Sequence, residues 1–259
     1  MKFLLELPIF VSVPIIIVFA VFISTMGLRF VRKRYTEEYL KNNHEVGGYF
    51  FNAFGLLYAV LIAFVVFVTW TEFDTSSRDI ELEANQTYLL YFNASEFPEP
   101  SRTEIRNAVK EYISIVINDE WKKLPYGEFD FKATLAITKL FNLYSRVDEK
   151  YAVSSQFYDE SVTRLNELSE LRRLRILAST SHVPTVIWII LFIGGFVSIA
   201  FTYFFGMKNA PVHYTLVGIL CSINALLLFL IYDLDHAFSG NDKISTHAFE
   251  VVLQVISSL

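Results

Sequence analysis

Apolar positions along this 259-residue chain are gathered into long uncharged blocks that alternate with polar stretches. A helix rises about 1.5 Å per residue, so about 20 mainly apolar residues are needed to cross a hydrocarbon core of about 30 Å. Each block reaches that length. The pattern therefore predicts four membrane-spanning helices, at residues 7–28, 46–71, 183–207 and 211–232. The first apolar run is longer than a typical secretory signal core, so we expect it to stay attached.

The residues between the second and third blocks form one polar segment, 72–182, with a helical pattern. Its first part contains no Pro or Gly before "FPEP" (97–100), which predicts that the second membrane helix continues unbroken into water. Ser101 and Glu104 have the spacing of a capping box for the next helix. That helix has an apolar face at spacings of three and four, made of Ile105, Val109, Tyr112 and Val116.

Two more helices and a tail complete the predicted order. After the turn "PYGE", the third helix of the segment carries Ile137, Leu140 and Tyr144. The fourth runs through "RRLR" (172–175) and carries four leucines, Leu165, Leu168, Leu171 and Leu174. The tail after residue 233 is predicted to be a turn and an amphipathic helix that docks through Ala248, Val252, Val255 and Leu259. The predicted fold is an all-α integral membrane protein in four parts, 1–71, 72–182, 183–232 and 233–259.

Charge and cysteine content exclude several functions. The single cysteine, Cys221, lies in the fourth block, so one chain cannot build a disulfide framework or a Cys-ligated metal site. A net charge of -5 disfavours nucleic-acid binding, which needs clustered Lys and Arg. No Gly-rich phosphate loop, zinc spacing or Ser-His-Asp ordering is present, so we expect neither an enzyme nor a metal site. Lys and Arg near the predicted spans are equally numerous on the two membrane sides, which leaves the orientation open.

The second span has two distinctive faces. Small and polar residues at one face would let another helix approach closely, and we predict helix packing through Asn52, Gly55, Ala59 and Ala63. The other face stacks rings and aliphatic side chains that could form a hydrophobic pore neck, made of Phe51, Phe54, Tyr58, Leu61, Val65 and Thr69. The alternative is that this stripe packs only against neighbouring helices or lipid. In the other spans, Gly194, Gly195, Ser198 and Thr202 predict close packing, and Ser222 and Asn224 can bond a neighbouring helix.

Carboxylates follow the ends of the second and fourth spans on one membrane side. The candidates for a pore mouth or an ion site are Glu72, Asp74, Asp233 and Asp235. Such groups concentrate cations, and their oxygens also suit Ca²⁺. The alternative is that they only cap helices where the chain re-enters water.

Several short motifs occur in a characteristic order: a basic loop, "NNHEVGG", "GLLYAVLIAFVV", a Trp and a Phe before "ELEAN", a helical insert, two further spans and "LDHAFSG". Over nearly its whole length the chain thereby resembles the bacterial bestrophin-like membrane family, known mainly as a domain of unknown function. The resemblance implies four membrane helices per subunit, a helical domain between the second and third, and a central pore lined by the second. It also implies that the insert faces the cytoplasm.

The same resemblance bears on calcium. In that family the fourth span ends with a pattern like Leu-Asp-x-Pro-Phe-Ser-Gly, and bestrophins follow a similar Pro-Phe-Gly with acidic residues that clasp Ca²⁺. Here Ala237 replaces the proline and only one carboxylate follows Gly240, in "NDKI". We therefore expect a turn at Phe238 to Gly240 and no cofactor, with Ca²⁺ as the one alternative.

Two functions remain. The first is an oligomeric ion channel, a tetramer or pentamer in the bacterial inner membrane, whose pore is lined by the second span and whose partners are lipids and inorganic ions. The second is a non-conducting membrane scaffold or sensor that acts through its helical insert. A hydrophilic stripe in the second span would favour the channel, and the span offers only Asn52, Tyr58 and Thr69.

Overall fold

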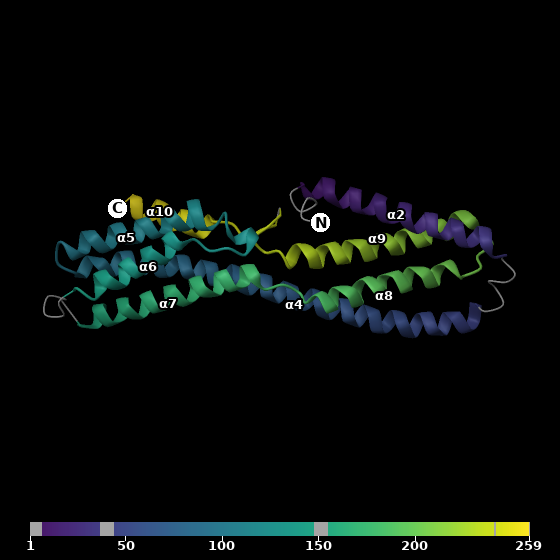
Figure 1. Ribbon diagram of the computed structural model, residues 1–259, viewed down its shortest axis with the longest axis horizontal. Helices are drawn as coiled ribbons and strands as arrows, with labels where there is room; N and C mark the ends of the chain where they lie inside the picture. Colours follow the sequence, from purple (N-terminus) through teal and green to yellow (C-terminus); the bar gives the residue numbers. More distant parts are fainter. Residues whose placement is uncertain (1–6, 37–43, 148–154, 241, 259) are drawn as a thin grey trace. The chain divides into compact units, whose positions relative to one another are not determined.

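The computed structural model describes residues 7–36, 44–147, 155–240 and 242–258. Within these residues every regular element is a helix (Figure 1). The chain divides into two compact units. We call the first the membrane unit (Met1–Thr71, His182–Asp235 and Ser239–Asp242) and the second the helical unit (Glu72–Ser181, His236–Phe238 and Lys243–Leu259).

The membrane unit contains α2 (Ile9–Arg34), the first part of α4 (His44–Asn93), α8 (Thr185–Tyr203) and α9 (Ala210–Leu234). Each of these helices is long and apolar enough to cross a membrane, which agrees with the four predicted spans. Helix α2 packs along α9 and also contacts α8. Many large apolar side chains on these helices are exposed in the isolated chain, as expected for surfaces that face lipid or another subunit.

Prolines and one asparagine set where these helices begin. Pro8 and Pro184 precede α2 and α8, at positions where the missing backbone N–H costs nothing. Helix α9 has Pro211 in its first turn, and the Asn209 side chain caps it by accepting a hydrogen bond from the Val212 amide at 3.4 Å.

The helical unit is built from the rest of α4 and five further helical elements of some length: α5 (Ser101–Ile115), the π-helical turn η2 (Val116–Glu120), α6 (Phe131–Tyr144), α7 (Ser155–Thr180) and α10 (His247–Ser257). Short 3₁₀ turns follow α4 (η1, Ala94–Glu96) and precede α6 (η3, Leu124–Tyr126). Helix α5 packs against α6 and α10. The core of the unit includes the predicted apolar residues of α5 and α6, all buried.

Helix α4 confirms one prediction and α5 corrects another. The second apolar block and the polar sequence after it form one helix of 50 residues, since no Pro or Gly interrupts its polar half. The predicted capping box at Ser101 is wrong. Ser101 is already the first helical residue and Pro100 is the N-cap, while the Thr103 amide donates to Glu99 Oε2 at 3.3 Å. Glu99 thus supplies the carboxylate near this helix start.

The C-terminal helix α10 does dock on the helical unit, through a face rotated from the predicted one. Phe249 and Ile256 are its fully buried residues, and Val255 is 39% exposed. The Phe249 ring lies edge-on to Trp121 with centroids 6.1 Å apart, and this contact sets the rotation of the helix. Ala248 and Val252 lie partly buried beside it, and the predicted Leu259 lies outside the described residues.

Candidate functional site

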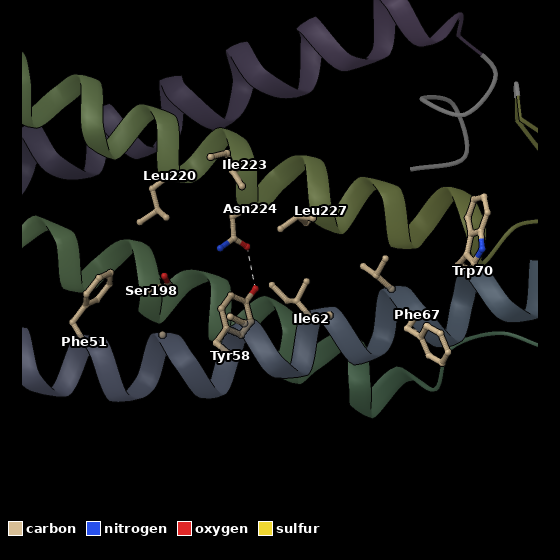
Figure 2. Close-up of a pocket in the computed structure, with 14 residues that line it drawn as sticks. Phe51, Tyr58, Ile62, Phe67, Trp70, Ser198, Leu220, Ile223, Asn224 and Leu227 are labelled. Atoms are coloured by element: carbon tan, nitrogen blue, oxygen red, sulfur yellow. Dashed lines mark hydrogen bonds between the residues drawn. The ribbon is translucent and has the colours of Figure 1, made fainter.

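Tyr58, in the membrane part of α4, forms hydrogen bonds to both α8 and α9. Its hydroxyl lies 2.9 Å from the Leu191 carbonyl oxygen on α8 and 3.0 Å from Asn224 Oδ1 on α9 (Figure 2). One hydroxyl proton is shared between these two acceptors. Asn224 therefore bonds a neighbouring helix as predicted, whereas Ser222 donates to the Gly218 oxygen of its own helix. Tyr58 joins the three helices at one point inside the apolar region.

Two glycines of α8 make room for this junction. A Cβ at Gly194 would overlap the ring of Tyr58. A Cβ at Gly195 would lie 2.9 Å from Asn224 Oδ1 and 3.0 Å from the Tyr58 hydroxyl oxygen. Both separations are shorter than ordinary contacts of a methyl group, so the close packing predicted from the two glycines is confirmed. The missing side chains at these two positions leave space for Tyr58 and Asn224.

A cavity of about 760 Å³ lies beside the junction, between α4, α8 and α9 (Figure 2). Its walls are mainly apolar and include Phe51, Ile62 and Phe67 of α4 and Leu220 of α9. Polar groups reach it from Asn224 and from side chains on each of the other two helices, Tyr58 and Ser198. The cavity thus combines apolar walls with a small polar region.

The six predicted pore-lining residues face the rest of their own chain. Tyr58, Val65 and Thr69 are each less than a tenth exposed. Phe51 and Phe54 make ring contacts with Phe201, at centroid distances of 6.2 and 6.1 Å. Leu61 packs beside the same apolar cluster. Helices α8 and α9 cover this stripe within one chain, so its side chains pack inside the subunit. That the stripe forms a pore neck stays a prediction.

The predicted helix-packing residues are open in the single chain. A Cβ at Gly55 would meet no atom within 4 Å, and Asn52, Ala59 and Ala63 are exposed. Gly55, Ala59 and Ala63 also line one edge of the cavity. This edge is therefore accessible to another molecule, as the prediction of close helix packing requires.

A third set of α4 residues, not selected from the sequence, points away from the other helices. Leu56, Val60 and Phe64 follow one another at spacings of four, so they share one face. They are 67%, 62% and 64% exposed. Their large apolar side chains form a continuous open stripe along the membrane part of α4, and the signal that could have revealed it was the i, i+4, i+8 spacing.

The four predicted mouth carboxylates differ in their surroundings. Asp74 forms an ion pair with Arg78, one helical turn later on α4. Glu72 is exposed on the same helix. Asp233 lies at the end of α9, partly buried. Of the two candidate carboxylates on α4, Glu72 is thus the one without an ion-pair partner among the described residues.

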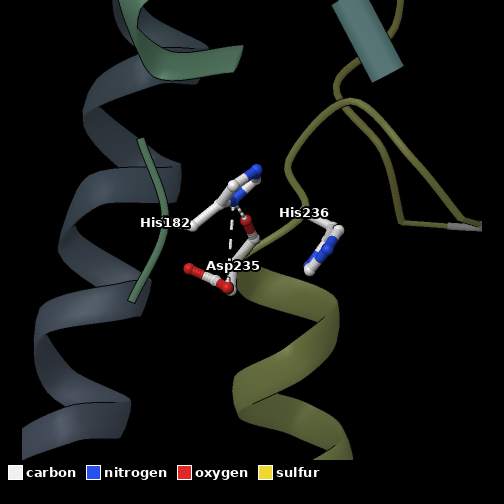
Figure 3. A group of neighbouring side chains, drawn as sticks. All are labelled: His182, Asp235 and His236. Atoms are coloured by element: carbon white, nitrogen blue, oxygen red, sulfur yellow. Dashed lines mark hydrogen bonds and ion pairs between the residues drawn. The ribbon is translucent and has the colours of Figure 1, made fainter. Parts of the chain in front are cut away.

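Asp235 acts as a structural anchor. Its side chain is only 3% exposed, and Oδ1 accepts a hydrogen bond from the Val183 amide at 2.6 Å. His182 Nδ1 lies 2.9 Å from the Asp235 carbonyl oxygen (Figure 3). Asp235 therefore ties the end of α9 to the start of the segment that leads into α8. A Ca²⁺ ion takes six to eight oxygen ligands. Asp235 offers one carboxylate here, and the neighbouring His182 side chain offers only ring nitrogens.

A family model for the bestrophin-like domain matches residues 15–249, almost the whole chain. The chain belongs to the bestrophin-like family. Solved structures agree on the fold. A variant of the bacterial bestrophin homologue from Klebsiella pneumoniae has a TM-score of 0.73 at 12% identity, covering 93% of this chain and 98% of the other. A second variant gives 0.71 at 11% identity, covering 95% and 99%. Among curated proteins, nothing matches this chain.

The helical unit of this bestrophin-like protein contains a buried charge network that the sequence analysis missed. Arg175 Nε donates to Glu83 Oε2 at 2.7 Å, and its Nη2 donates to Glu120 Oε2 at 2.8 Å. Arg172 donates to the other oxygen of Glu120 at 2.5 Å. Two carboxylates and two guanidinium groups thus compensate one another. The basic run "RRLR" in the predicted fourth helix of the segment gives no sign of this, yet two of its arginines, Arg172 and Arg175, are buried.

The ion pairs and hydrogen bonds of this network shift the pKa values of Glu120 and Tyr112. Burial alone would raise the pKa of Glu120, but the hydrogen bond from Arg172 and the charges of Arg175 and Arg172 outweigh it and hold the pKa below its ordinary value. Tyr112 donates to Glu83 Oε1 at 2.6 Å, and its burial together with the Glu83 charge raises the pKa of the phenol. Glu120 is therefore ionised around neutral pH, and Tyr112 is a neutral donor.

Proposed function

We propose that this bestrophin-like chain assembles into an oligomeric ion channel whose pore is lined by the membrane part of α4. The bestrophin-like fold suggests an ion-channel family. The single observation that carries the proposal is the open stripe of α4, where Leu56, Val60 and Phe64 are exposed although the opposite side of the helix is packed. A rotational arrangement of several copies would bring these stripes together around one axis.

Within this proposal the stripe is a hydrophobic neck. Between Gly47 and Thr71 the helix carries no charged residue. Rings of large apolar side chains exclude water when the constriction is narrow, and conduction then requires the neck to widen and wet. The packed stripe that includes Tyr58 and Val65 would hold each α4 against α8 and α9, so that the helix moves as part of its membrane unit.

The polar mouth in this proposal is the exposed carboxylate of Glu72. Asp74 is paired with Arg78, and Asp235 is held by the Val183 amide, so neither offers a free charge to a passing ion. A ring of Glu72 side chains would raise the local concentration of cations. The bestrophins that the sequence resembles conduct anions. Whether this channel prefers cations or anions therefore shows whether it shares their selectivity.

Reconstitution of the purified protein into a planar bilayer under a KCl gradient tests the proposal. The channel predicts a current whose reversal potential follows one ion. Persistent silence across voltage, pH and calcium concentration, with the oligomer shown intact by its mass in detergent, would contradict it. That result would favour the other function, a non-conducting scaffold or sensor acting through the helical unit.

A further inference from the structure

The cavity between α4, α8 and α9 contains polar groups that the protein itself leaves unused. Asn224 is less than a tenth exposed, and its Oδ1 is bonded to the Tyr58 hydroxyl. Its amide nitrogen has no hydrogen-bond partner among the described residues, and it is directed away from Tyr58 (Figure 2). In this apolar setting a hydrogen-bond acceptor that enters the cavity would stabilise the nitrogen.

Ser198 repeats the pattern on the neighbouring helix. A serine inside a helix normally donates to a carbonyl three or four residues earlier, as Ser222 does to the Gly218 oxygen at 2.7 Å. Ser198 is only 5% exposed and lines the cavity, yet within the described part of the chain its hydroxyl has no such bond. Two independent donors therefore reach the same cavity from two helices.

The remaining walls limit the chemistry of an occupant. Of the fourteen residues that line the cavity, all described by the structure, none is charged. A phospholipid headgroup or a fatty-acid carboxylate would be buried there without a counter-charge, which is strongly unfavourable. A plain hydrocarbon chain would leave both donors unpaired. The aromatic rings of Phe51 and Phe67 offer flat apolar contact on the α4 side.

We propose that this cavity binds an uncharged, membrane-soluble ring compound that carries a carbonyl oxygen, the chemistry of a lipid-soluble quinone. The carbonyl accepts from the Asn224 amide and the Ser198 hydroxyl, and the ring lies among the apolar walls. The volume of about 760 Å³ falls within the usual range of small-molecule sites. Asn224 lies near the middle of α9, so the ligand would reach the site from the interior of the bilayer. The inference does not depend on ion conduction.

Binding of a decyl-substituted benzoquinone to the full-length protein in detergent tests the proposal, with decylbenzene as the matched probe without oxygens. Equilibrium dialysis measures both affinities directly. We expect the quinone to bind about ten-fold or more tighter than decylbenzene, as one or two hydrogen bonds in a dry site would give. We also expect Ser198→Ala to weaken quinone binding several-fold and to leave decylbenzene binding unchanged.

A cavity-filling variant tests whether a small ligand or a second copy of the chain occupies the cavity. Gly55→Leu places a large side chain at the cavity edge and should abolish quinone binding, while Leu57→Ala, a substitution on the far side of α4, should preserve it. Equal affinity for the two probes, or quinone binding that survives both Gly55→Leu and Ser198→Ala, would overturn the proposal. Absence of quinone binding to the native protein would also overturn it. A loss of oligomer mass in Gly55→Leu would then indicate that a second copy of the chain occupies the cavity.

Discussion

Arg175 on α7 and Glu83 on α4 form an ion pair of 2.7 Å in which both side chains are fully buried. Ninety-two residues separate them in the sequence. Arg175 also lies 5.3 Å from the centroid of the Trp121 ring, and Trp121 in turn packs against Phe238 and Phe249. The pair therefore joins α4 to α7 and to the docked C-terminal segment within the helical unit.

Removing one member of this pair should destabilise the helical unit strongly. Arg175→Met keeps much of the side-chain volume but leaves the Glu83 charge buried without its main partner, which costs about 3–5 kcal/mol in comparable cases. Thermal unfolding followed by circular dichroism in detergent measures the effect. Arg173→Met is the matched control, because Arg173 is exposed and pairs with Glu170 one turn earlier. Similar melting temperatures for the two variants would contradict a central role of the buried pair.

Acid should weaken the helical unit through Glu120. Its pKa in the folded protein lies below the ordinary value of 4.5, so between these two values the unfolded chain binds more protons than the folded one. The stabilisation is therefore complete above 4.5 and is lost as pH falls through the lowered pKa. Melting temperatures measured at a series of pH values should fall on acidification, and Glu120→Gln should flatten that fall. Glu111→Gln, at an exposed carboxylate paired with Lys139, should keep the native slope.

Replacing a glycine by alanine should have different effects on stability at two positions of the membrane unit. Gly194→Ala should lower the stability of the membrane unit, because the new Cβ overlaps the Tyr58 ring and displaces its hydroxyl from Asn224. Gly55→Ala should leave stability nearly unchanged, since its Cβ meets open space. Unfolding of both variants by denaturant in detergent, with tryptophan fluorescence as the signal, compares them. A tolerated Gly194→Ala would show that the close packing at this junction is absent.

Glu72 should set part of the ion selectivity. Glu72→Gln removes a carboxylate at the proposed mouth, so the reversal potential under a KCl gradient should shift toward the value for chloride. Asp74→Gln should shift it less, because Arg78 already compensates the charge of Asp74. Identical reversal potentials for the native protein and Glu72→Gln would remove this residue from the ion path.

The membrane helices and the length of α4 could be predicted from the sequence because their signals are local. Long uncharged blocks, and the absence of Pro and Gly from residues 72–97, are enough to specify them. The family resemblance was also visible, since its motifs lie in order along the chain. The prediction at Ser101 failed for a local reason too, because Pro100 and Glu99 already supply the start of that helix.

The buried arginines could not be predicted, because the groups that neutralise them lie far away in the sequence. A basic run such as "RRLR" is ordinarily solvated, and only the folded chain brings Glu83 and Glu120 to Arg175. The faces of α4 posed a similar difficulty. Aromatic and aliphatic residues occur all around its membrane part, so periodicity alone could not tell which stripe meets α8 and α9. Packing within the chain buries Tyr58 and Val65 and leaves Val60 open.

Thiol modification of the open stripe during current recording tests the proposed pore most directly. In a variant in which Cys221 is replaced by alanine, Val60→Cys and Val65→Cys place one thiol on each side of α4. A charged, water-soluble methanethiosulfonate reagent should change the current of Val60→Cys within seconds to minutes and leave that of Val65→Cys unaltered. Modification of Val65→Cys alone would assign the pore to the packed stripe. An unchanged current in both variants would contradict a pore lined by α4.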